Sequence, residues 1–376
     1  MRSSLFHINN PTNEIPESVT TNILAESNSL EYHRSLPGYK PTPLIDLPSL
    51  AAEYGVKNIY IKDESFRFEL NAFKGLGASY AIHKLLESKP DIETFCTATD
   101  GNHGRAVAWA AVMNGKTARI FVPRDTTLSR MEAIESEGGV VEKFNGNYDE
   151  TCEYARIMAD GNGWTLAQDT AWEDYTEIPA HIMAGYITHF KELEETIHTL
   201  PQPGVDIILL QSGVGSWPAA AAWYYTHRYK SNKPILVTVE PLEAAGLLAS
   251  FQAGNRTSPT GNFRTIMAGL NCGIPSLTAW DILKETVSAS IAISDSYIVT
   301  AIKKLYSNPV IGQKIISGES GAAGLAGFIA IMTDPDLFEL QKSLGINGNT
   351  RVLCYSTEGA TDPGNFQRII DDMPSQ

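Results

Sequence analysis

The chain alternates short apolar runs with longer stretches in which apolar residues recur every three or four positions. The short runs are rich in β-branched residues and predict strands, whereas the longer stretches predict amphipathic helices. Helices are expected, for example, at residues 102–113, 178–196 and 296–305. Strands are expected at residues 58–63, 94–99, 118–122, 140–144, 164–168, 206–211, 234–239, 288–293 and 351–356.

Strands that alternate with helices predict βαβ units and a mostly parallel sheet, so the fold class is α/β. The units between residues 80 and 165 are expected to form a smaller domain, and residues 166–376 a larger, cofactor-binding one. Residues 1–79 are expected to supply an N-terminal arm, rich in Pro, Ser and Asn over its first fifty residues, and part of the large domain. Parallel sheets bind ligands beyond the carboxyl ends of their strands, so functional residues should follow the strands.

Composition narrows the classes of function. The 376 residues are 43% hydrophobic, which is enough for a sizeable core. The formal net charge is −14, and a generally acidic surface argues against nucleic acid and against anionic membrane surfaces as partners. The N-terminus lacks the apolar segment of a signal peptide, and no apolar run reaches transmembrane length. The sequence therefore predicts a cytoplasmic protein.

The four cysteines form no CxxC pair and no Cys/His cluster with the spacing of a zinc site, so no metal is expected. Cys96 and Cys354 lie inside apolar runs. We interpret both as core thiols in a reducing compartment.

A lysine in an unusual setting is the first candidate for chemistry. Lys74 follows Phe73 in the opening turn of a predicted helix, and Gly75 and Gly77 come directly after it. Most helix lysines are solvated. Here the glycines allow a flat ring to approach the backbone, and an apolar, partly desolvated site should lower the pKa of the lysine and make it a carbonyl nucleophile.

Polar residues follow three other predicted strands. The loop 97–104 carries Thr99, Asp100 and Asn102 and opens a helix, while Asp169 and Thr357 each follow a strand. Each of these loops alone is also explained by ordinary turn and cap residues. The functional alternative is a set of backbone N–H groups and polar side chains that face one ligand.

The glycine-rich turn 211–218 also lies between a strand and a helix. Its backbone N–H groups can point at one anion, and the helix N-terminus adds positive potential. A competing interpretation is a dinucleotide-binding dehydrogenase, in which Gly213 and Gly215 begin the fingerprint and Glu240 binds the ribose. Pro218 stands where the third glycine of that fingerprint belongs.

Taken in order, these motifs resemble the fold-type II pyridoxal 5′-phosphate (PLP) enzymes, and the resemblance runs from about residue 42 to 359. It implies two α/β domains with the active site between them, and a homodimer. It also implies that Lys74 carries PLP as a Schiff base and that Asn102 bonds the cofactor's 3′-oxygen. The phosphate is expected at Ser212, Gly213, Val214, Gly215 and Ser216, and the pyridine nitrogen at Thr357, with Ser356 as the alternate.

Within that family the motifs are most similar to the diaminopropionate ammonia-lyases, at residues 71–74, 99–104, 168–173, 267–273 and 356–359. This likeness implies a small amino-acid substrate, 2,3-diaminopropionate, that loses ammonia to give pyruvate. Lys74 and Asp100 would be bases on opposite faces, which would admit both enantiomers. Asp169 is assigned to substrate charge or proton transfer, and Thr99 to substrate binding. A serine or threonine dehydratase of the same fold is the alternative.

Overall fold

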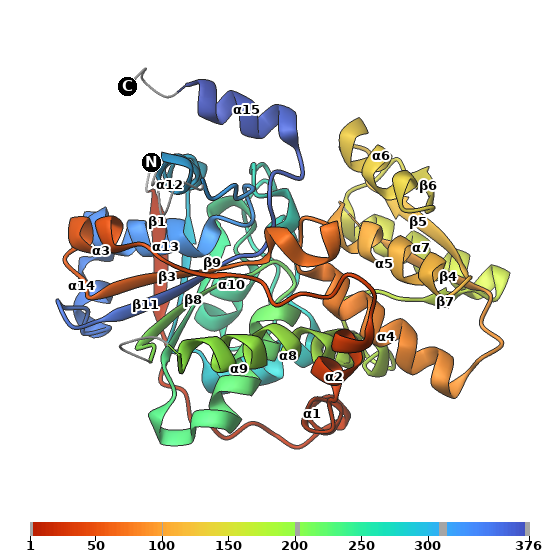
Figure 1. The fold of residues 1–376 in the computed structure, drawn as a ribbon, viewed down its shortest axis with the longest axis horizontal. Helices are drawn as coiled ribbons and strands as arrows, with labels where there is room; N and C mark the ends of the chain where they lie inside the picture. The colour runs from red at the N-terminus through yellow and green to blue at the C-terminus, as the bar shows by residue number, and fades with distance from the viewer. Residues whose placement is uncertain (1–2, 100, 200–203, 308–313, 373–376) are drawn as a thin grey trace.

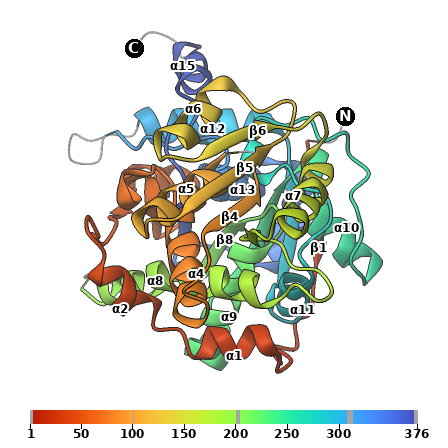
Figure 2. The same ribbon diagram turned by 90° about the vertical axis from the view of Figure 1, so that its right-hand side faces the viewer.

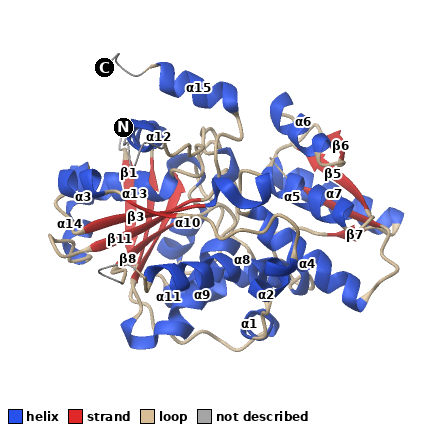
Figure 3. Cartoon of the chain, viewed as in Figure 1, coloured by secondary structure: helices blue, strands red, loops and turns tan. Residues whose placement is uncertain are grey.

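The computed structural model describes residues 3–99, 101–199, 204–307 and 314–372. Within these ranges the chain forms two sheets, each with helices on both faces (Figures 1 and 3). The larger sheet occupies the left of Figure 1 and the smaller one the right, and in Figure 2 the smaller sheet lies in front of the larger. The α/β class and the expectation of two sheets are confirmed.

The larger sheet has seven strands in the order β1-β10-β9-β8-β11-β3-β2. The five inner strands run parallel, and only the edge strands β1 and β2 are antiparallel to their neighbours. Their bounds are β1 (Ser4–Ile8), β2 (Leu44–Asp46), β3 (Asn58–Asp63), β8 (Ile207–Gln211), β9 (Ile235–Pro241), β10 (Ala289–Ile293) and β11 (Arg351–Ser356).

The smaller sheet has four parallel strands in the order β6-β5-β4-β7. They are β4 (Thr94–Ala98), β5 (Thr117–Val122), β6 (Val140–Lys143) and β7 (Thr165–Leu166). Helices α4 (Lys74–Ser88), α5 (Asn102–Met113) and α6 (Leu128–Ser136) supply the apolar cluster on one face, and α7 (Tyr148–Asn162) supplies that on the other. The four strands predicted between residues 94 and 168 are therefore found together.

The core of the larger sheet follows from the two-residue period of its strands, because successive side chains point to opposite faces. Leu209 packs with one apolar cluster, whereas Ile208 and Leu210 pack with the other. The first cluster is completed by α3 (Pro48–Tyr54), α12 (Asp295–Ser307), α13 (Ala323–Thr333) and α14 (Phe338–Ser343), and the second by α8 (Glu177–Ile197), α9 (Ser216–Tyr229) and α11 (Leu277–Thr286).

The first fifty residues were expected to form an N-terminal arm, but they contain regular helices and strands. They contain α1 (Val19–Ala25), α2 (Ser29–Ser35) and both antiparallel edge strands. β1 pairs with β10, nearly three hundred residues away, so it was not recognisable from its local sequence. The helices α10 (Gly246–Ala253) and α15 (Pro363–Asp371) complete the fold. Among the described helices none combines the length and apolarity that crossing a bilayer requires.

Candidate active site

A cavity collects the loops that follow β4, β7, β8 and β11, together with the first turn of α4. This is where parallel strands are expected to bind a ligand. Asp100 lies outside the described residues, and Ser212 is fully buried away from the cavity wall. The remaining predicted site residues all line the cavity: Lys74, Thr99, Asn102, Asp169, Gly213, Val214, Gly215, Ser216 and Thr357.

Lys74 is the first residue of α4, and its side chain is 21% exposed. Its Nζ lies 2.5 Å from Oδ2 of Asp169. Burial disfavours the charged amine, but the Asp169 carboxylate outweighs burial, so the pKa of Lys74 is raised. The expectation of a lowered pKa was therefore wrong in this structure, because the sequence did not reveal the carboxylate in contact with the amine.

Asp169 lies in the loop after β7 and is almost fully buried. Burial favours its neutral form, but the Lys74 ammonium prevails and lowers the pKa of Asp169 to about 2. The carboxylate is thus charged at neutral pH. Sequence reasoning placed Lys74 and Asp169 in one site, and the structure brings the two side chains into direct contact.

His103 also lines the cavity, although the sequence gave no reason to single it out. Its Nε2 lies 2.7 Å from the carbonyl oxygen of Ala167, which can only accept, so Nε2 carries the proton. Nδ1 is buried, has no hydrogen-bond partner among the described residues, and lies 3.9 Å from Oδ2 of Asp169. Burial lowers the pKa of His103, so a neutral imidazole presents a free lone pair beside the Lys74–Asp169 pair.

The loop between β4 and α5 is held by Thr99. Its hydroxyl oxygen accepts from the N–H groups of Gly101 at 2.9 Å and Gly104 at 3.1 Å. Gly104 has no room for a side chain, because a Cβ there would lie 2.3 Å from Cγ2 of Thr99. This packing sets Asn102 at the cavity wall, where its amide donates to Glu358. Thr99 therefore has a clear structural role in addition to its predicted contact with substrate.

Glu358 is a cavity residue that sequence reasoning did not assign. It is 3% exposed, and its carboxylate accepts from Asn102 and from the Ser320 N–H. The pairing spans 256 residues of sequence, so no local pattern revealed it.

The glycine-rich turn between β8 and α9 has the geometry of an anion site. Gly215 precedes α9 with a φ of +94°, which favours glycine. The N–H groups of Gly213, Val214 and Gly215 have no partner among the described residues, and the first N–H groups of α9 are free by helix geometry. Pro218 is tolerated in this first turn because a backbone N–H at that position would have no acceptor within the helix, so its absence in proline costs no hydrogen bond. The turn therefore fits a phosphate group.

Two serines of the same turn have different positions. The Ser216 hydroxyl donates to the carbonyl oxygen of Asp169 at 2.5 Å, which ties the turn to the loop that carries that aspartate. The Ser212 N–H donates to the carbonyl oxygen of Val239, and its hydroxyl contacts the carbonyl oxygen of Gly213. Ser212 thus extends the hydrogen bonding of the sheet and contacts the backbone of the turn on the side away from the cavity.

At the end of β11 the structure distinguishes two hydroxyls. Thr357 lines the cavity and accepts from Nε2 of Gln211 at 3.0 Å. Ser356 instead donates to the Ser317 hydroxyl at 2.9 Å and is absent from the lining. Of the two candidates for the pyridine nitrogen, Thr357 is therefore the one that lines the cavity.

The dinucleotide interpretation needs a free Glu240 carboxylate, and the structure does not provide one. Glu240 is fully buried, and its two oxygens accept from the N–H groups of Leu247 at 2.7 Å and Leu248 at 2.8 Å, at the start of α10. The carboxylate serves as a helix cap. Across the described ranges, no group of three or more His, Cys, Asp or Glu side chains is arranged to hold a metal ion.

Taken together, an amine on a helix start, a phosphate cradle and a polar group for a ring nitrogen fit one cofactor, PLP. The family model of pyridoxal-phosphate dependent enzymes matches residues 35–357, and the chain belongs to this family. Among curated relatives, it is 38% identical to a diaminopropionate ammonia-lyase of Salmonella typhimurium over 365 residues, which cover 91% of this chain and 90% of that protein.

Solved structures extend the comparison. A crystal structure of the Escherichia coli diaminopropionate ammonia lyase in complex with an aminoacrylate–PLP azomethine reaction intermediate is 35% identical, with a TM-score of 0.90 over 98% of this chain and 97% of that chain. The same enzyme in its apo form gives a TM-score of 0.83 at 32% identity, over 98% and 96% of the two chains. A threonine deaminase of Solanum lycopersicum, at 20% identity and a TM-score of 0.78, shares the fold.

Proposed function

We propose that the protein uses PLP, bound to Lys74, to eliminate ammonia from 2,3-diaminopropionate and release pyruvate and ammonia. The observation that carries the proposal is the Lys74–Asp169 pair beside the free N–H groups of the glycine-rich turn. The extended likeness to diaminopropionate ammonia-lyases supports it. In the Escherichia coli relative a complex with D-serine has also been solved.

The cofactor, when bound, supplies an electron sink that stabilises negative charge at the substrate Cα. The residues that would hold it are Lys74 for the carbonyl carbon, the turn from Gly213 to Ser216 for the phosphate, Thr357 for the pyridine nitrogen and Asn102 for the 3′-oxygen. All of them line one cavity. The Glu358 carboxylate orients the Asn102 amide by accepting its N–H.

Lys74 is the proposed base on one face of the substrate. Its amine lies in the cavity and would accept the Cα proton of a bound substrate. Asp169 is the proposed partner of the β-ammonium group, because it is charged, almost fully buried and already positioned on a cation. A buried carboxylate favours a cationic β-substituent over the neutral hydroxyl of serine.

Asp100 is the proposed base on the opposite face, a role carried by the family resemblance. Asp100→Asn keeps size and removes the base, so turnover of D-diaminopropionate should fall by about 10²-fold or more. Turnover of the L-isomer should fall much less, because Lys74 remains. Steady-state kinetics on both enantiomers decide this, and an equal loss for D and L would contradict the two-base arrangement.

The alternative function is a serine or threonine dehydratase of the same fold, and comparing substrates distinguishes the two. Purified enzyme with PLP should release pyruvate from diaminopropionate with a kcat/KM well above that for D- or L-serine, and ketobutyrate from threonine should be slower still. If serine or threonine is the better substrate, the dehydratase assignment replaces ours.

We also propose that the domains divide as residues 1–79 with 166–376 against residues 80–165, and that the enzyme is a cytoplasmic homodimer. The two separate sheets support the division. None of the described cysteines forms a disulfide, which suits a reducing compartment. Light scattering on the purified protein tests the dimer.

A further inference from the structure

Trp217 is a bulky residue directly after the phosphate turn, at the second position of α9. It lines the cavity and is only 5% exposed. Its indole Nε1–H, which can only donate, lies 2.9 Å from Nε2 of His189 in α8. Nε2 must therefore be unprotonated, so the ring proton of His189 is on Nδ1. Burial lowers the pKa of His189, which keeps the imidazole neutral.

His189 contacts two residues that line the cavity, Phe73 and Trp217. The Phe73 ring stacks on the imidazole, with centroids 6.0 Å apart, and Phe73 immediately precedes Lys74. Trp217 meets the same Phe73 ring edge-on at 5.8 Å, and immediately follows Ser216. The residue after the phosphate turn is thus held by a directed hydrogen bond to this buried imidazole, whereas Phe73 makes only a ring contact with it.

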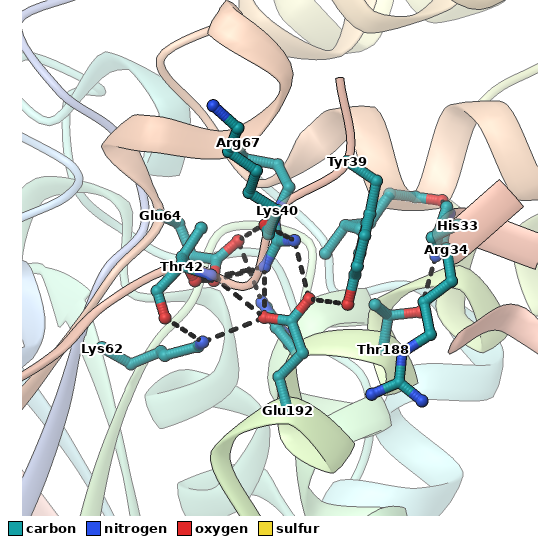
Figure 4. A network of polar contacts seen from close by, with 12 residues as sticks. His33, Arg34, Tyr39, Lys40, Thr42, Lys62, Glu64, Arg67, Thr188 and Glu192 are labelled. Atoms are coloured by element: carbon teal, nitrogen blue, oxygen red, sulfur yellow. Dashed lines mark hydrogen bonds and ion pairs between the residues drawn. The ribbon is translucent and has the colours of Figure 1, made fainter. Parts of the chain in front are cut away.

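Behind His189 lies a buried charge network, which we define as Lys62, Glu64, Arg67 and Glu192 (Figure 4). Arg67 bonds Glu64 at 2.9 Å and Glu192 at 2.8 Å, and Lys62 bonds Glu192 at 2.9 Å. All four side chains are at most 1% exposed. The Nδ1 of His189 lies 3.5 Å from Oε2 of Glu64, the network atom that it faces, although the geometry is not that of a hydrogen bond among the described residues.

The network is balanced and fixed in several directions. Two cations face two carboxylates, and the pairs that Lys62 and Arg67 make with Glu192 join the segment at residues 62–67 to α8. The N-terminal segment adds the Thr42 hydroxyl, 2.5 Å from Glu64, and the Tyr39 hydroxyl, 2.8 Å from Glu192. Satisfied buried networks are rigid, because any displacement leaves a charge without its partner.

We propose that His189 and Trp217 are positioning residues that couple this buried charge network to the glycine-rich turn, and so set the affinity for the phosphate of PLP. The inference rests on PLP being the cofactor, as proposed above. It assigns a function to Trp217, the bulky residue directly after the phosphate turn.

Trp217→Phe tests the coupling, because it keeps an aromatic ring in place and removes the donor to His189. We expect the affinity for PLP to fall roughly 5- to 30-fold, the effect of losing one buried hydrogen bond. The matched control is Trp223→Phe in the same helix, because the Trp223 indole nitrogen has no partner among the described residues. Affinities come from titrating the protein with PLP and following visible absorbance.

Pyridoxal, which lacks the phosphate, separates this role from a general loss of structure. Trp217→Phe should weaken PLP binding and leave pyridoxal binding near the wild-type value. His189→Leu should behave like Trp217→Phe, and His189→Gln should restore most of the PLP affinity, because its amide can accept from Trp217 and donate to Glu64. The double variant Trp217→Phe/His189→Leu should lose little more than either single variant.

Equal effects of Trp217→Phe and Trp223→Phe, or an equal loss for PLP and pyridoxal, would overturn the inference. Failure of the wild-type protein to bind PLP at all would instead overturn the proposed function. The two failures are therefore distinguishable in one set of titrations.

Discussion

Replacing Glu192 by glutamine is the sharpest probe of the buried charge network. The change keeps the shape of the side chain and removes one negative charge. Glu192 accepts from Lys62 at 2.9 Å and from Arg67 through two nitrogens at 2.8 Å. In the variant, Arg67 would keep Glu64, whereas Lys62 would have no carboxylate partner among the described residues, at a site where the side chains are at most 1% exposed. One positive charge would then be buried without a partner.

Removing one partner of a buried ion pair costs about 3–5 kcal/mol, since the other charge remains desolvated. A unit charge pair about 4 Å apart at an effective dielectric constant near 20 gives about 4 kcal/mol, which agrees. For a domain of this size, a loss of that magnitude lowers Tm by on the order of 10 °C. The glutamine amide replaces only one of the two accepting oxygens, and its NH2 group would face donors of the network, which adds to the loss.

Urea unfolding and thermal melts of the Glu192→Gln variant measure this loss. The matched control is Glu195→Gln in the same helix, because the Glu195–Arg34 pair is about half exposed on both sides and should contribute roughly 0–1 kcal/mol. The double variant Lys62→Met/Glu192→Gln restores charge balance and should recover part of the loss. If Glu192→Gln is as mild as Glu195→Gln, the reasoning about a balanced buried network is refuted.

Three further predictions address the cavity. Lys74→Ala should abolish the visible absorbance of bound cofactor. Borohydride reduction followed by peptide mapping should label Lys74 in the wild type. The control Lys84→Ala, on the same helix, should change neither result. Gly215→Asp should weaken PLP affinity strongly, because a Cβ there would crowd Ala279 and Leu283 at a φ of +94° and distort the turn that presents the N–H groups. Gly254→Asp, at another left-handed position with open space around it, should leave PLP affinity unchanged. The pKa of Asp169 is lowered from 3.8 to about 2 in protein without PLP. The ion pair with Lys74 therefore stabilises the fold fully at pH values well above 3.8, and its contribution is lost as the pH falls toward 2. The stability difference between wild type and Asp169→Asn should be about 2 kcal/mol at pH 5 and about half of that at pH 3, measured by chemical unfolding, and a difference that does not shrink would argue against the pair.

Much of the scaffold was predictable because its strands are short, apolar and bounded by turn residues. The expected ranges 58–63 and 351–356 match β3 and β11, and 102–113 matches α5. The edge strands β1 and β2 were missed, since they are short and lie in a segment rich in Pro, Ser and Asn. β1 pairs with β10, which is distant in sequence, and β2 pairs with the edge of β3. Both strands are therefore defined by tertiary contacts and not by a local pattern.

The site was predictable where a motif follows a strand, and unpredictable where its geometry depends on distant partners. Lys74 and Asp169 were both singled out, but their contact was not, and so the direction of the pKa shift of Lys74 was missed. Glu358 and His103 lie inside the motifs 356–359 and 99–104, but the motifs did not indicate what either side chain contacts. Their roles appear only when loops separated by 64 to 256 residues meet at one cavity.

The network around Glu192 illustrates the same limit on a larger scale. Lys62 and Glu192 are 130 residues apart, and each reads locally as a charged residue that belongs at the surface. Only the packing of α8 against the large sheet buries them together. Trp217 likewise has no local sign of a partner, whereas in the structure its indole donates to His189, 28 residues away.

The central claim is that this chain removes the β-amino group of 2,3-diaminopropionate with PLP on Lys74. The most direct measurement uses substrate labelled with ¹⁵N at the β-position, purified holoenzyme, and quantification of pyruvate and of labelled and unlabelled ammonia. We predict equal amounts of pyruvate, labelled ammonia and unlabelled ammonia, with no product from the Lys74→Ala variant. Absence of pyruvate, or retention of the label in an organic product, would contradict the account.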